Sequence, residues 1–593
     1  MKKRYILVPA LLVAGVAFFM QRPSKAKWYE KALEDVTRAI EEVEGAGKKA
    51  LQSVANVVIG PFKKKIKKEQ YPISKNPYKE TIAVIRRGGP ISEGEQTYVA
   101  MRRQSAHKAL KRFVGFDTGM DAGLSLSGGG NRAAVYMWGA LDALDQIGLL
   151  DAMTWMTTLS GSGWMIWPWL ASGSNLQDHK ARLLASVTHG PALRNKKHVK
   201  GVIDVILRDL AYGRLVNLAT LYGAGLGSIF FDGFGEYRDP QMVWMDKIQN
   251  NMNASPALFP YPIMTTLSVP DGRWFTVTPH EFGSAALKAF IPEWAGQREF
   301  FGGGSVGKKP YADRVAVARW MGDSALAPGA SFGELYLNIF AAMPEEKKGQ
   351  RVAKQLLEAF FAQSPMERLR AVYSERYNFL YGVPGLPMYN KVKKQTWGDV
   401  KTVKFTDVGV ISGNPILPLL ERAAISTTPV IIVIIDASSV VGYDELAVLR
   451  DYAVGGNPDG IVLPFPELPS DRKQLSTQTV TAFSNDKVLM IYMPMVKNEQ
   501  LIAAYKDNPA FKDIVSKLGW DLKKRLGGSY NTFNLKYTYE KAEELIALAQ
   551  FNVLVSADKI RAAIREYGLK YMEKTNPNHA QQIRQLFAGA AAG

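Results

Sequence analysis

The chain has 593 residues and carries 74 lysines and arginines against 55 aspartates and glutamates, a formal net charge of +19 at pH 7. A hydrophobic content of 47% argues against extensive disorder, and the absence of cysteine excludes disulfides, thiolate catalysis and cysteine-based zinc sites. The positive balance favours an anionic partner, either nucleic acid or an acidic membrane face.

Residues 1–22 form a segment that is typical of a signal peptide or a membrane anchor. Basic residues at positions 2–4 precede sixteen uncharged residues, from Tyr5 to Met20. As a helix, this stretch would span about 24 Å, less than the roughly 30 Å core of a bilayer. No clear cleavage site precedes Lys27, which favours an uncleaved anchor. The segment predicts membrane association or export, and the basic residues on both sides leave its orientation open.

Residues 23–75 are expected to form a helical and basic extension. Apolar residues recur at helical spacing over residues 28–44, and a second helical stretch reaches about Val58. Five lysines then follow between positions 63 and 68. Such a cluster is either a solvated linker or a patch that contacts anionic lipid next to a membrane. Nucleic acid is disfavoured, because no zinc signature or aromatic-basic module accompanies the lysines.

Residues 76–593 have the composition of one globular catalytic domain. Two segments, beginning near residues 122 and 152, each predict a strand, a tight turn and a helix in that order. The β-branched run VIIVIID, which ends at Asp436, is typical of a strand that is buried on both faces. Strands that alternate with helices predict an α/β fold with a parallel sheet.

The first of the two turns contains three consecutive glycines, in the sequence SLSGGGNRAA. Glycines at residues 128–130 would let backbone N–H groups point into a cavity, where the helix N-terminus adds partial positive charge. The turn could then bind an anion or a developing oxyanion, with Arg132 adding a full charge nearby. A plain turn is the alternative, and a dinucleotide loop is disfavoured because the G-x-G-x-x-G spacing is missing.

The second turn lies in TTLSGSGWMIWPW, residues 157–169, where small and hydroxyl residues interrupt an apolar segment. A nucleophile elbow presents one serine at a sharp turn between a strand and a helix, with small residues two positions before and after it. Ser160 has Thr158 before it and Ser162 after it. Ser162 has Trp164 after it, and neither serine fits G-x-S-x-G, so a closely packed loop is the alternative.

Together the two turns resemble those of the cytosolic (group IV) phospholipase A2 and fungal phospholipase B (lysophospholipase) family, which are patatin-like lipid acyl hydrolases. Residues 127–133 match the family pattern S-G-G-G-x-R-A, and residues 158–164 follow G-L-S-G-S-T-W with a threonine in place of the first glycine and Gly163 in place of the threonine. Further counterparts extend the resemblance over roughly residues 90–555: FPYPIMTTLS, RWFTVTPHEFGS, AFIPEW and KFTDVGVISGNPILPLL. The resemblance implies a mixed, largely parallel central sheet flanked by helices, with a short helical N-terminal extension.

The resemblance also implies an activity: hydrolysis of phospholipid or lysophospholipid acyl esters by a Ser–Asp dyad, without a cofactor or metal. It places the nucleophile at Ser162, the second serine of L-S-G-S, and the base at Asp407. Arg132 would bind phosphate or stabilise the anion. Backbone N–H groups of three glycines would form the oxyanion hole: Gly129, Gly130 and Gly163.

A carboxylate base is also expected from the residues themselves, because none of the six histidines lies at a strand end or elbow next to the serine. The ordinary pKa of an aspartate, near 3.9, makes it a weak base, so burial would have to raise the pKa of this one. Asp436 is the rival candidate because it ends a strongly apolar strand. The resemblance favours Asp407.

Two other functions compete with hydrolysis. One is a catalytically inactive, membrane-associated scaffold of the same fold, and the other is a nucleic-acid-binding protein that the net charge would explain. The expected partner is a phospholipid membrane surface, with anionic lipid contacted by the basic extension and no nucleic acid. The oligomeric state stays open.

Overall fold

The computed structural model describes most of the chain from residue 76 onward. The described ranges are 76–189 without 79, residue 205, 218–231, 243–306, 315–325, 374–532 without 392, 439 and 440, residue 534, and 536–592. The predicted anchor at residues 1–22 and the predicted extension at residues 23–75 lie outside them. Within the described part of the chain, no helix has the length and apolar character that a bilayer crossing requires.

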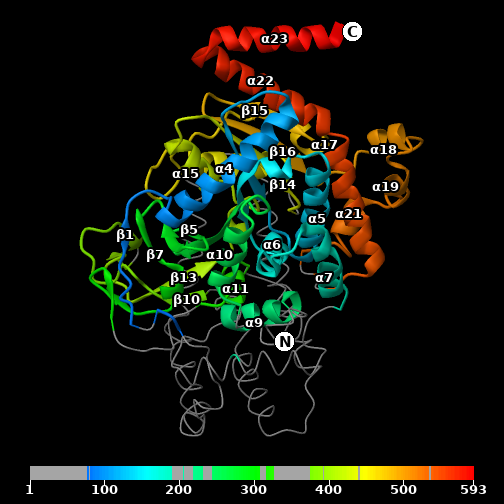
Figure 1. The fold of residues 1–593 in the computed structure, drawn as a ribbon. Helices are drawn as coiled ribbons and strands as arrows, with labels where there is room; N and C mark the ends of the chain where they lie inside the picture. The colour runs from blue at the N-terminus through cyan, green and yellow to red at the C-terminus, as the bar shows by residue number, and fades with distance from the viewer. Residues whose placement is uncertain are drawn as a thin grey trace, which may run out of the picture.

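A twelve-stranded mixed sheet forms the centre of the structure (Figure 1). Its middle strands are parallel neighbours in the order β4-β3-β2-β14-β16. Their bounds are Tyr261–Val269, Met153–Thr158, Asp121–Leu126, Val430–Asp436 and Val488–Pro494. Every residue of β14 is buried, as the apolar run predicts for a strand that is covered on both faces.

Antiparallel strands extend the sheet on both sides. Beyond β16 lies β15 (Thr481–Ser484), and beyond β4 lie β5 (Trp274–Val277), β6 (Glu281–Ser284), β7 (Ala289–Pro292) and β1 (Arg86–Arg87). Two further strands, β10 (Ser374–Tyr377) and β13 (Thr402–Thr406), pair with each other. The prediction of a mixed, largely parallel sheet is confirmed.

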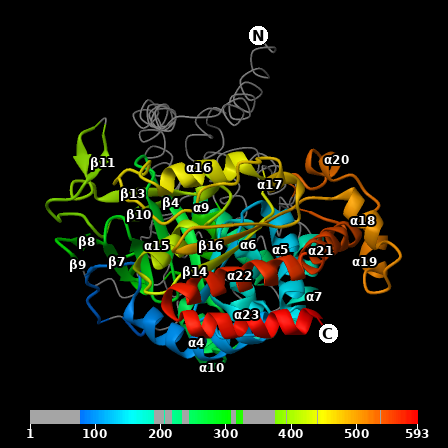
Figure 2. The same cartoon turned by 90° about the horizontal axis from the view of Figure 1, so that it is seen from above.

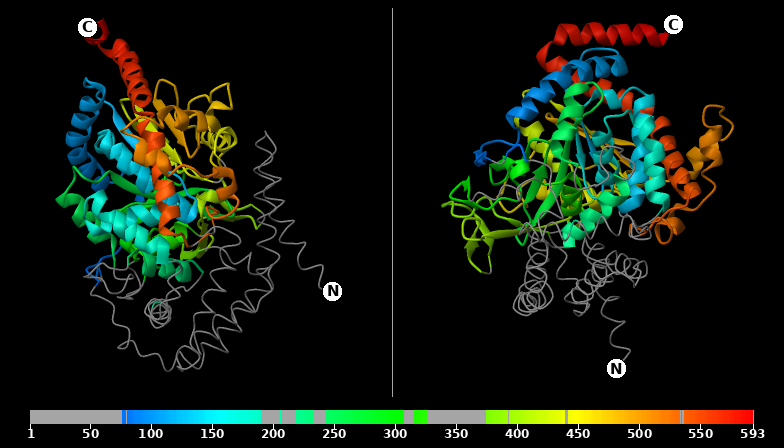
Figure 3. Two further views of the ribbon diagram at one scale, coloured as in Figure 1. Left: turned by 90° about the vertical axis from the view of Figure 1, so that its right-hand side faces the viewer. Right: turned by 60° about the horizontal axis from the view of Figure 1, so that its bottom comes forward.

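Helices surround the sheet (Figure 3). Both α4 (Glu93–Val114) and α15 (Leu417–Ile425) contact β3, which is also contacted by α6 (Gly161–Ser172). In turn, α6 packs against α5 (Gly130–Gln146), and α5 packs along α21 (Tyr539–Leu554). The remaining helices near the sheet are α7 (Leu176–His189), α9 (Leu218–Phe230), α10 (Met245–Ala254), α11 (Val317–Ser324), α16 (Tyr443–Ala453) and α17 (Gln474–Thr477).

The C-terminal helices lie at the periphery. Figures 1 and 2 show α22 (Ala557–Thr575) and α23 (Pro577–Ala592) packed together at one end, and a group of short helices projecting from the side. That group consists of α18 (Glu499–Tyr505), α19 (Lys512–Ser516) and α20 (Leu522–Leu526). Two small hairpins complete the described strands: β8 (Phe300–Phe301) with β9 (Gly304–Ser305), and β11 (Met388–Asn390) with β12 (Gln395–Thr396).

Two strands, β3 and β13, pair with successive parts of one edge of β4. Residues 261–264 of β4 pair with β3 in parallel, whereas residues 267–269 pair with β13 in the antiparallel sense. Leu267 also pairs with Trp274 of β5, so β5 lies on the opposite edge and β13 continues the edge that β3 leaves. Because β3 and β13 run toward each other along this edge, their C-terminal ends meet.

Two threonines of β4 hold the meeting point. The Thr265 hydroxyl donates to the carbonyl of Thr158, the last residue of β3, at 3.2 Å. The Thr266 hydroxyl donates to the carbonyl of Thr406, the last residue of β13, at 2.9 Å. Residues that follow the two strands are therefore brought together, although about 250 positions separate them in the sequence.

Candidate active site

Ser160 lies at a sharp turn between β3 and α6. Its backbone angles, φ 49° and ψ −120°, fall in a region that residues other than glycine rarely adopt. A strained serine at a turn between a strand and a helix is the defining feature of a nucleophile elbow. Part of Ser160 remains exposed, while its neighbours on both sides are buried.

The elbow packs directly on the glycine turn between β2 and α5. A Cβ atom on Gly161 would lie 2.1 Å from the carbonyl oxygen of Gly130, which no real contact allows. A Cβ atom on Gly128 would lie 3.3 Å from the Cβ of Ser160. The glycine after Ser160 is therefore needed so that the two turns can touch.

Ser162 does not occupy the position of a nucleophile. Its side chain is completely buried, and its hydroxyl lies 2.9 Å from the carbonyl oxygens of both Leu126 and Leu159, to which it can donate. The same hydroxyl accepts the N–H of Leu159 at 3.0 Å. These bonds fix the end of β3 against β2 and engage the Ser162 hydroxyl with backbone groups. The geometry therefore favours Ser160 over the predicted Ser162 as the candidate nucleophile.

Asp407 follows the last residue of β13 and is 3% exposed. Its Oδ1 accepts the Gly409 N–H at 2.7 Å. Burial raises the pKa of Asp407 from its ordinary value of 3.8 to about 6, and the Gly409 N–H and the nearby Ser160 hydroxyl offset part of that rise. Such a pKa suits a carboxylate that must accept a proton near neutral pH.

The glycine turn has the geometry that the sequence predicts for an anion-binding loop. Gly129 and Gly130 have φ values of 137° and 62°, which side chains would disfavour. The N–H of Gly128 is occupied, because it donates to the Gly413 carbonyl at 2.8 Å. The following residues open α5, so their N–H groups lie at a helix N-terminus with partial positive charge.

Arg132 stands beside this turn and is 1% exposed. Its Nε donates to the Ala437 carbonyl and its Nη1 to the Tyr530 carbonyl, both at 2.8 Å. Within the described residues its Nη2 has no hydrogen-bond partner, and it lies 2.8 Å from where a Cβ on Gly129 would be. The guanidinium is thus held rigidly with one nitrogen left for an anion.

Gly163 lies inside α6 and does not reach the glycine turn. A Cβ placed on it would make ordinary contacts, at 3.6 Å to Trp167 and 3.8 Å to the Thr158 hydroxyl. The residue whose N–H follows the strained serine is Gly161. The sequence analysis named Gly163 because it follows Ser162, the predicted nucleophile. It therefore missed Gly161, which follows Ser160.

Asp436, the rival base, is bound elsewhere. Its side chain has no exposed surface, its Oδ1 accepts the Ser438 N–H at 2.9 Å, and its Oδ2 accepts the Tyr492 hydroxyl at 2.6 Å. In the sheet order, β2 lies between β14 and β3, which places the end of β14 about 10 Å from the end of β3. Among the described residues, no hydrogen bond of the Asp436 side chain involves either serine of the elbow.

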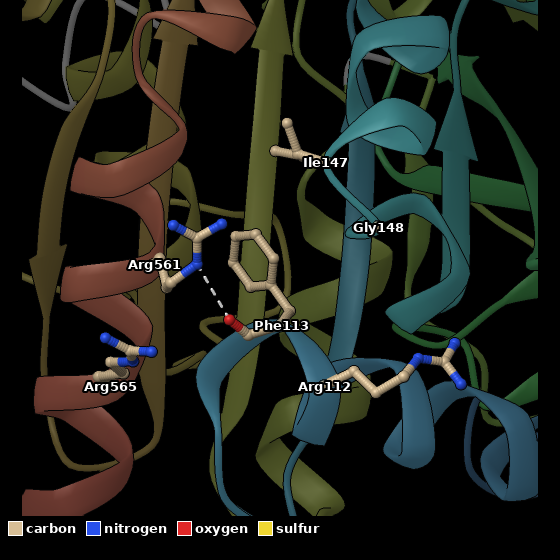
Figure 4. A pocket seen from close by; sticks show the side chains of 6 residues that line it. All are labelled: Arg112, Phe113, Ile147, Gly148, Arg561 and Arg565. Carbon is tan, nitrogen blue, oxygen red and sulfur yellow. Dashed lines mark hydrogen bonds between the residues drawn. The ribbon is translucent and has the colours of Figure 1, made fainter. Parts of the chain in front are cut away.

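A cavity of about 350 Å³ lies at the other end of α5, next to the C-terminus of α4 (Figure 4). Its lining residues are Arg112, Phe113, Ile147, Gly148, Arg561 and Arg565. Arg561 donates to the Phe113 carbonyl at 3.1 Å, and Arg565 donates to the Val114 carbonyl at 2.7 Å, so both bind the last carbonyls of α4. Because α5 is about 25 Å long, this cavity is separate from the elbow.

A strained serine between a strand and a helix, a buried carboxylate near it and an adjacent glycine turn are typical of α/β serine hydrolases. A family model described as "Lysophospholipase catalytic domain" matches residues 122–371. Human cytosolic phospholipase A2 zeta is 23% identical over 549 residues, which are 81% of this chain and 62% of that protein. Human cytosolic phospholipase A2 delta is 23% identical over 79% of this chain and 63% of its own length.

A probable lysophospholipase 3 of Schizosaccharomyces pombe is 27% identical over 34% of this chain and 36% of its own length. The solved structure of human GIVD cytosolic phospholipase A2 has the same fold, with a TM-score of 0.64 and 18% identity over 82% of this chain and 68% of that one. The resemblance to the cytosolic phospholipase A2 and lysophospholipase family is thereby confirmed. This chain spans less than two thirds of the length of the two human relatives.

Proposed function

We propose that this protein hydrolyses acyl esters of phospholipids or lysophospholipids, with Ser160 as the nucleophile and Asp407 as the base. The observation that carries the proposal is the strained Ser160 at the elbow, whose hydroxyl is close enough to the buried Asp407 to lower the pKa of that carboxyl. The family match supports a lipid ester as the substrate class.

The proposed reaction has two stages. Asp407 takes the hydroxyl proton of Ser160 while Oγ attacks the ester carbonyl, and the tetrahedral intermediate collapses to an acyl-enzyme as the alcohol leaves with that proton. Water then attacks the acyl group with Asp407 again acting as the base, which releases the fatty acid and restores Ser160. Atoms balance without a cofactor, since water is the only co-reactant.

The oxyanion of each tetrahedral intermediate would be bound by three backbone N–H groups. These come from Gly129, Gly130 and Gly161, with Gly161 replacing the predicted Gly163. A donor of this kind typically contributes about 10²–10³ to the rate, because it is oriented before the charge develops. The free Nη2 of Arg132 would add a positive charge for the substrate phosphate or for the oxyanion.

Membrane contact through residues 1–75, and location at a membrane or outside the cell, stay predictions. Each of the lysines between positions 63 and 68 could contribute about 1 kcal/mol at an anionic surface, in a salt-dependent way. Neutralising them should weaken binding to acidic vesicles and leave binding to zwitterionic vesicles unchanged. An equal loss on both would contradict an electrostatic role.

A fluorophosphonate probe tests the proposed nucleophile directly. One solved relative is a complex with methyl gamma-linolenyl fluorophosphonate, which is an electrophile of this type. We expect the wild-type chain to be labelled on Ser160, to hydrolyse phosphatidylcholine or lysophosphatidylcholine vesicles, and to lose both properties in Ser160→Ala. A folded wild-type chain that neither labels nor hydrolyses would favour the inactive scaffold, and labelling at Ser162 would contradict the assignment.

A further inference from the structure

The loop that follows Asp407 also holds the glycine turn. Ser412 and Gly413 lie a few residues beyond Asp407, and the Gly413 carbonyl accepts the Gly128 N–H at 2.8 Å. The Ser412 N–H in turn donates to the Val408 carbonyl at 3.1 Å, so this loop is closed on itself. One short turn therefore links the proposed base to the proposed oxyanion loop, and its position fixes their separation.

Glu445, which lies in a different part of the chain, accepts hydrogen bonds from this turn. Its Oε1 accepts the Ser412 hydroxyl at 2.6 Å and also accepts the Gly413 N–H. Glu445 is the third residue of α16, where the helix dipole favours a negative charge. The turn has little freedom on its other side, because a Cβ on Gly413 would lie 2.8 Å from the Cβ of Ser438.

The helix that carries Glu445 is itself anchored to the sheet. The N–H of Gly442, which precedes α16, donates to the Tyr492 hydroxyl at 2.8 Å, and that hydroxyl donates to Asp436 at 2.6 Å. Burial and the nearby charge of Asp436 raise the pKa of Glu445, while its bonds to Ser412 and Gly413 act in the opposite sense. The bonds from Gly442 to Tyr492 and from Tyr492 to Asp436 therefore fix the end of the helix that carries Glu445.

We propose that Glu445 is a positioning residue for the hydrolysis: it fixes the Ser412–Gly413 turn and so sets the distance between the glycine turn and Asp407. The inference rests on the proposed function. Glu445 contacts neither substrate nor the reacting atoms, and it acts through the backbone of Gly413. A displacement of about 1 Å in such an arrangement can lower a rate by about 10²-fold.

The test compares three variants in the full chain. Glu445→Ala removes the acceptor, Glu445→Gln keeps an oxygen that can accept both bonds, and Asp444→Ala removes a neighbouring, exposed acid from the same first turn of α16. We expect Glu445→Ala to lower kcat by about 10- to 10²-fold with KM nearly unchanged, and to slow fluorophosphonate labelling to a similar degree. Glu445→Gln should restore most of the rate, and Asp444→Ala should match the wild type.

Thermal unfolding of each variant separates a positioning role from general destabilisation. Two results would overturn the inference: a folded Glu445→Ala whose kcat equals that of Asp444→Ala, or a Glu445→Gln that is as slow as Glu445→Ala. In either case, hydrolysis by the wild type would leave the proposed function intact. If Glu445→Ala does not fold, Ser412→Ala provides the test. It removes one of the two Glu445 bonds, together with the bond that the Ser412 hydroxyl accepts from the Asn414 N–H at 3.1 Å, and keeps the bond from the Gly413 N–H. It should lower kcat severalfold, and an unchanged kcat there would also overturn the inference.

Discussion

Two strand ends in this molecule carry a buried aspartate, and they differ in what each carboxylate binds. At the end of β14, Asp436 is held by the Tyr492 hydroxyl and by the N–H of Ser438. At the end of β13, Asp407 accepts the Gly409 N–H and is close enough to the Ser160 hydroxyl for that hydroxyl to lower its pKa. The first carboxylate anchors a helix through Tyr492, whereas the second faces a strained and partly exposed serine.

The difference teaches that a carboxylate at the end of an apolar strand is not by itself a catalytic site. The neighbouring strand decides the role. Strand β14 ends beside β2 and β16, which offer it a tyrosine and backbone groups. Strand β13 ends where β3 stops on the shared edge of β4, so its next residue meets the elbow.

The largest effect is expected when Ser160, the serine near Asp407, is replaced. Ser160→Ala should lower kcat by about 10⁴–10⁶-fold, as the loss of a nucleophile does in serine hydrolases, and should remain folded. Ser162→Ala should retain far more activity but lose about 1–3 kcal/mol of stability, because it leaves buried backbone groups without their partner. Steady-state hydrolysis and thermal unfolding of both variants measure this. A dead, well-folded Ser162→Ala beside an active Ser160→Ala would reverse the assignment.

The next effect compares the two aspartates directly. Asp407→Asn keeps the shape and removes the proton acceptor, so kcat should fall by about 10²–10⁴-fold. Asp436→Asn should act mainly on stability, since its carboxylate bonds only structural groups. Both variants are to be assayed for hydrolysis and unfolding at the same pH. The comparison fails if folded Asp407→Asn is nearly as active as the wild type.

The third prediction concerns the effect of Asp407 on the stability of the fold. A rise in the pKa of Asp407 from 3.8 to about 6 corresponds to roughly 3 kcal/mol of lost stability once the carboxylate is ionised. Because the folded pKa is the higher one, this loss develops as pH rises from about 4 to above 6. Asp407→Asn should therefore be more stable than the wild type at pH 7.5, and this advantage should disappear near pH 4. Urea unfolding at the two pH values provides the measurement.

A further prediction compares two glycines of the elbow, Gly161 and Gly163. Gly161→Ala should lower kcat by about 10²-fold and destabilise the fold, because the new Cβ would strike the Gly130 carbonyl at 2.1 Å. Gly163→Ala is the matched control, since its Cβ would make only ordinary contacts within a helix. It should keep its activity and gain up to about 1 kcal/mol of stability. Equal losses in the two variants would argue against Gly161 as the oxyanion donor.

The smallest expected effect is a gradual change of kcat/KM with pH. If Asp407 must be ionised to accept the proton, kcat/KM should fall about tenfold per pH unit below the pKa of Asp407, which lies at about 6. The falling limb should have a slope of one, since one proton is involved. A pH profile on a neutral vesicle substrate measures it. A flat profile between pH 4.5 and 7 would exclude Asp407 as the base.

The sequence alone determined the class of the fold, and it supplied candidate residues for the site. The β-branched run at β14 and the alternation of strands with helices predicted the parallel sheet, because such runs only suit strands covered on both faces. Three glycines before a helix predicted an anion-binding turn, and Gly129 and Gly130 do have left-handed φ values. Asp407 came from the family motif rather than from periodicity, and in the structure it is buried with the Ser160 hydroxyl near enough to lower its pKa.

The tertiary structure decided which serine lies near Asp407. The local pattern already separated the two serines in part, because Ser160 has small residues two positions before and after it whereas Ser162 has Trp164 after it, and the prediction of Ser162 came from the resemblance. Only the folded chain shows that the first is strained by the packing of Gly161 on Gly130, while the second is buried among backbone carbonyls. Glu445 likewise gave no sequence signal, because 33 positions separate it from Ser412. Backbone strain and contacts between distant segments arise from the packing of the whole sheet, which local sequence does not encode.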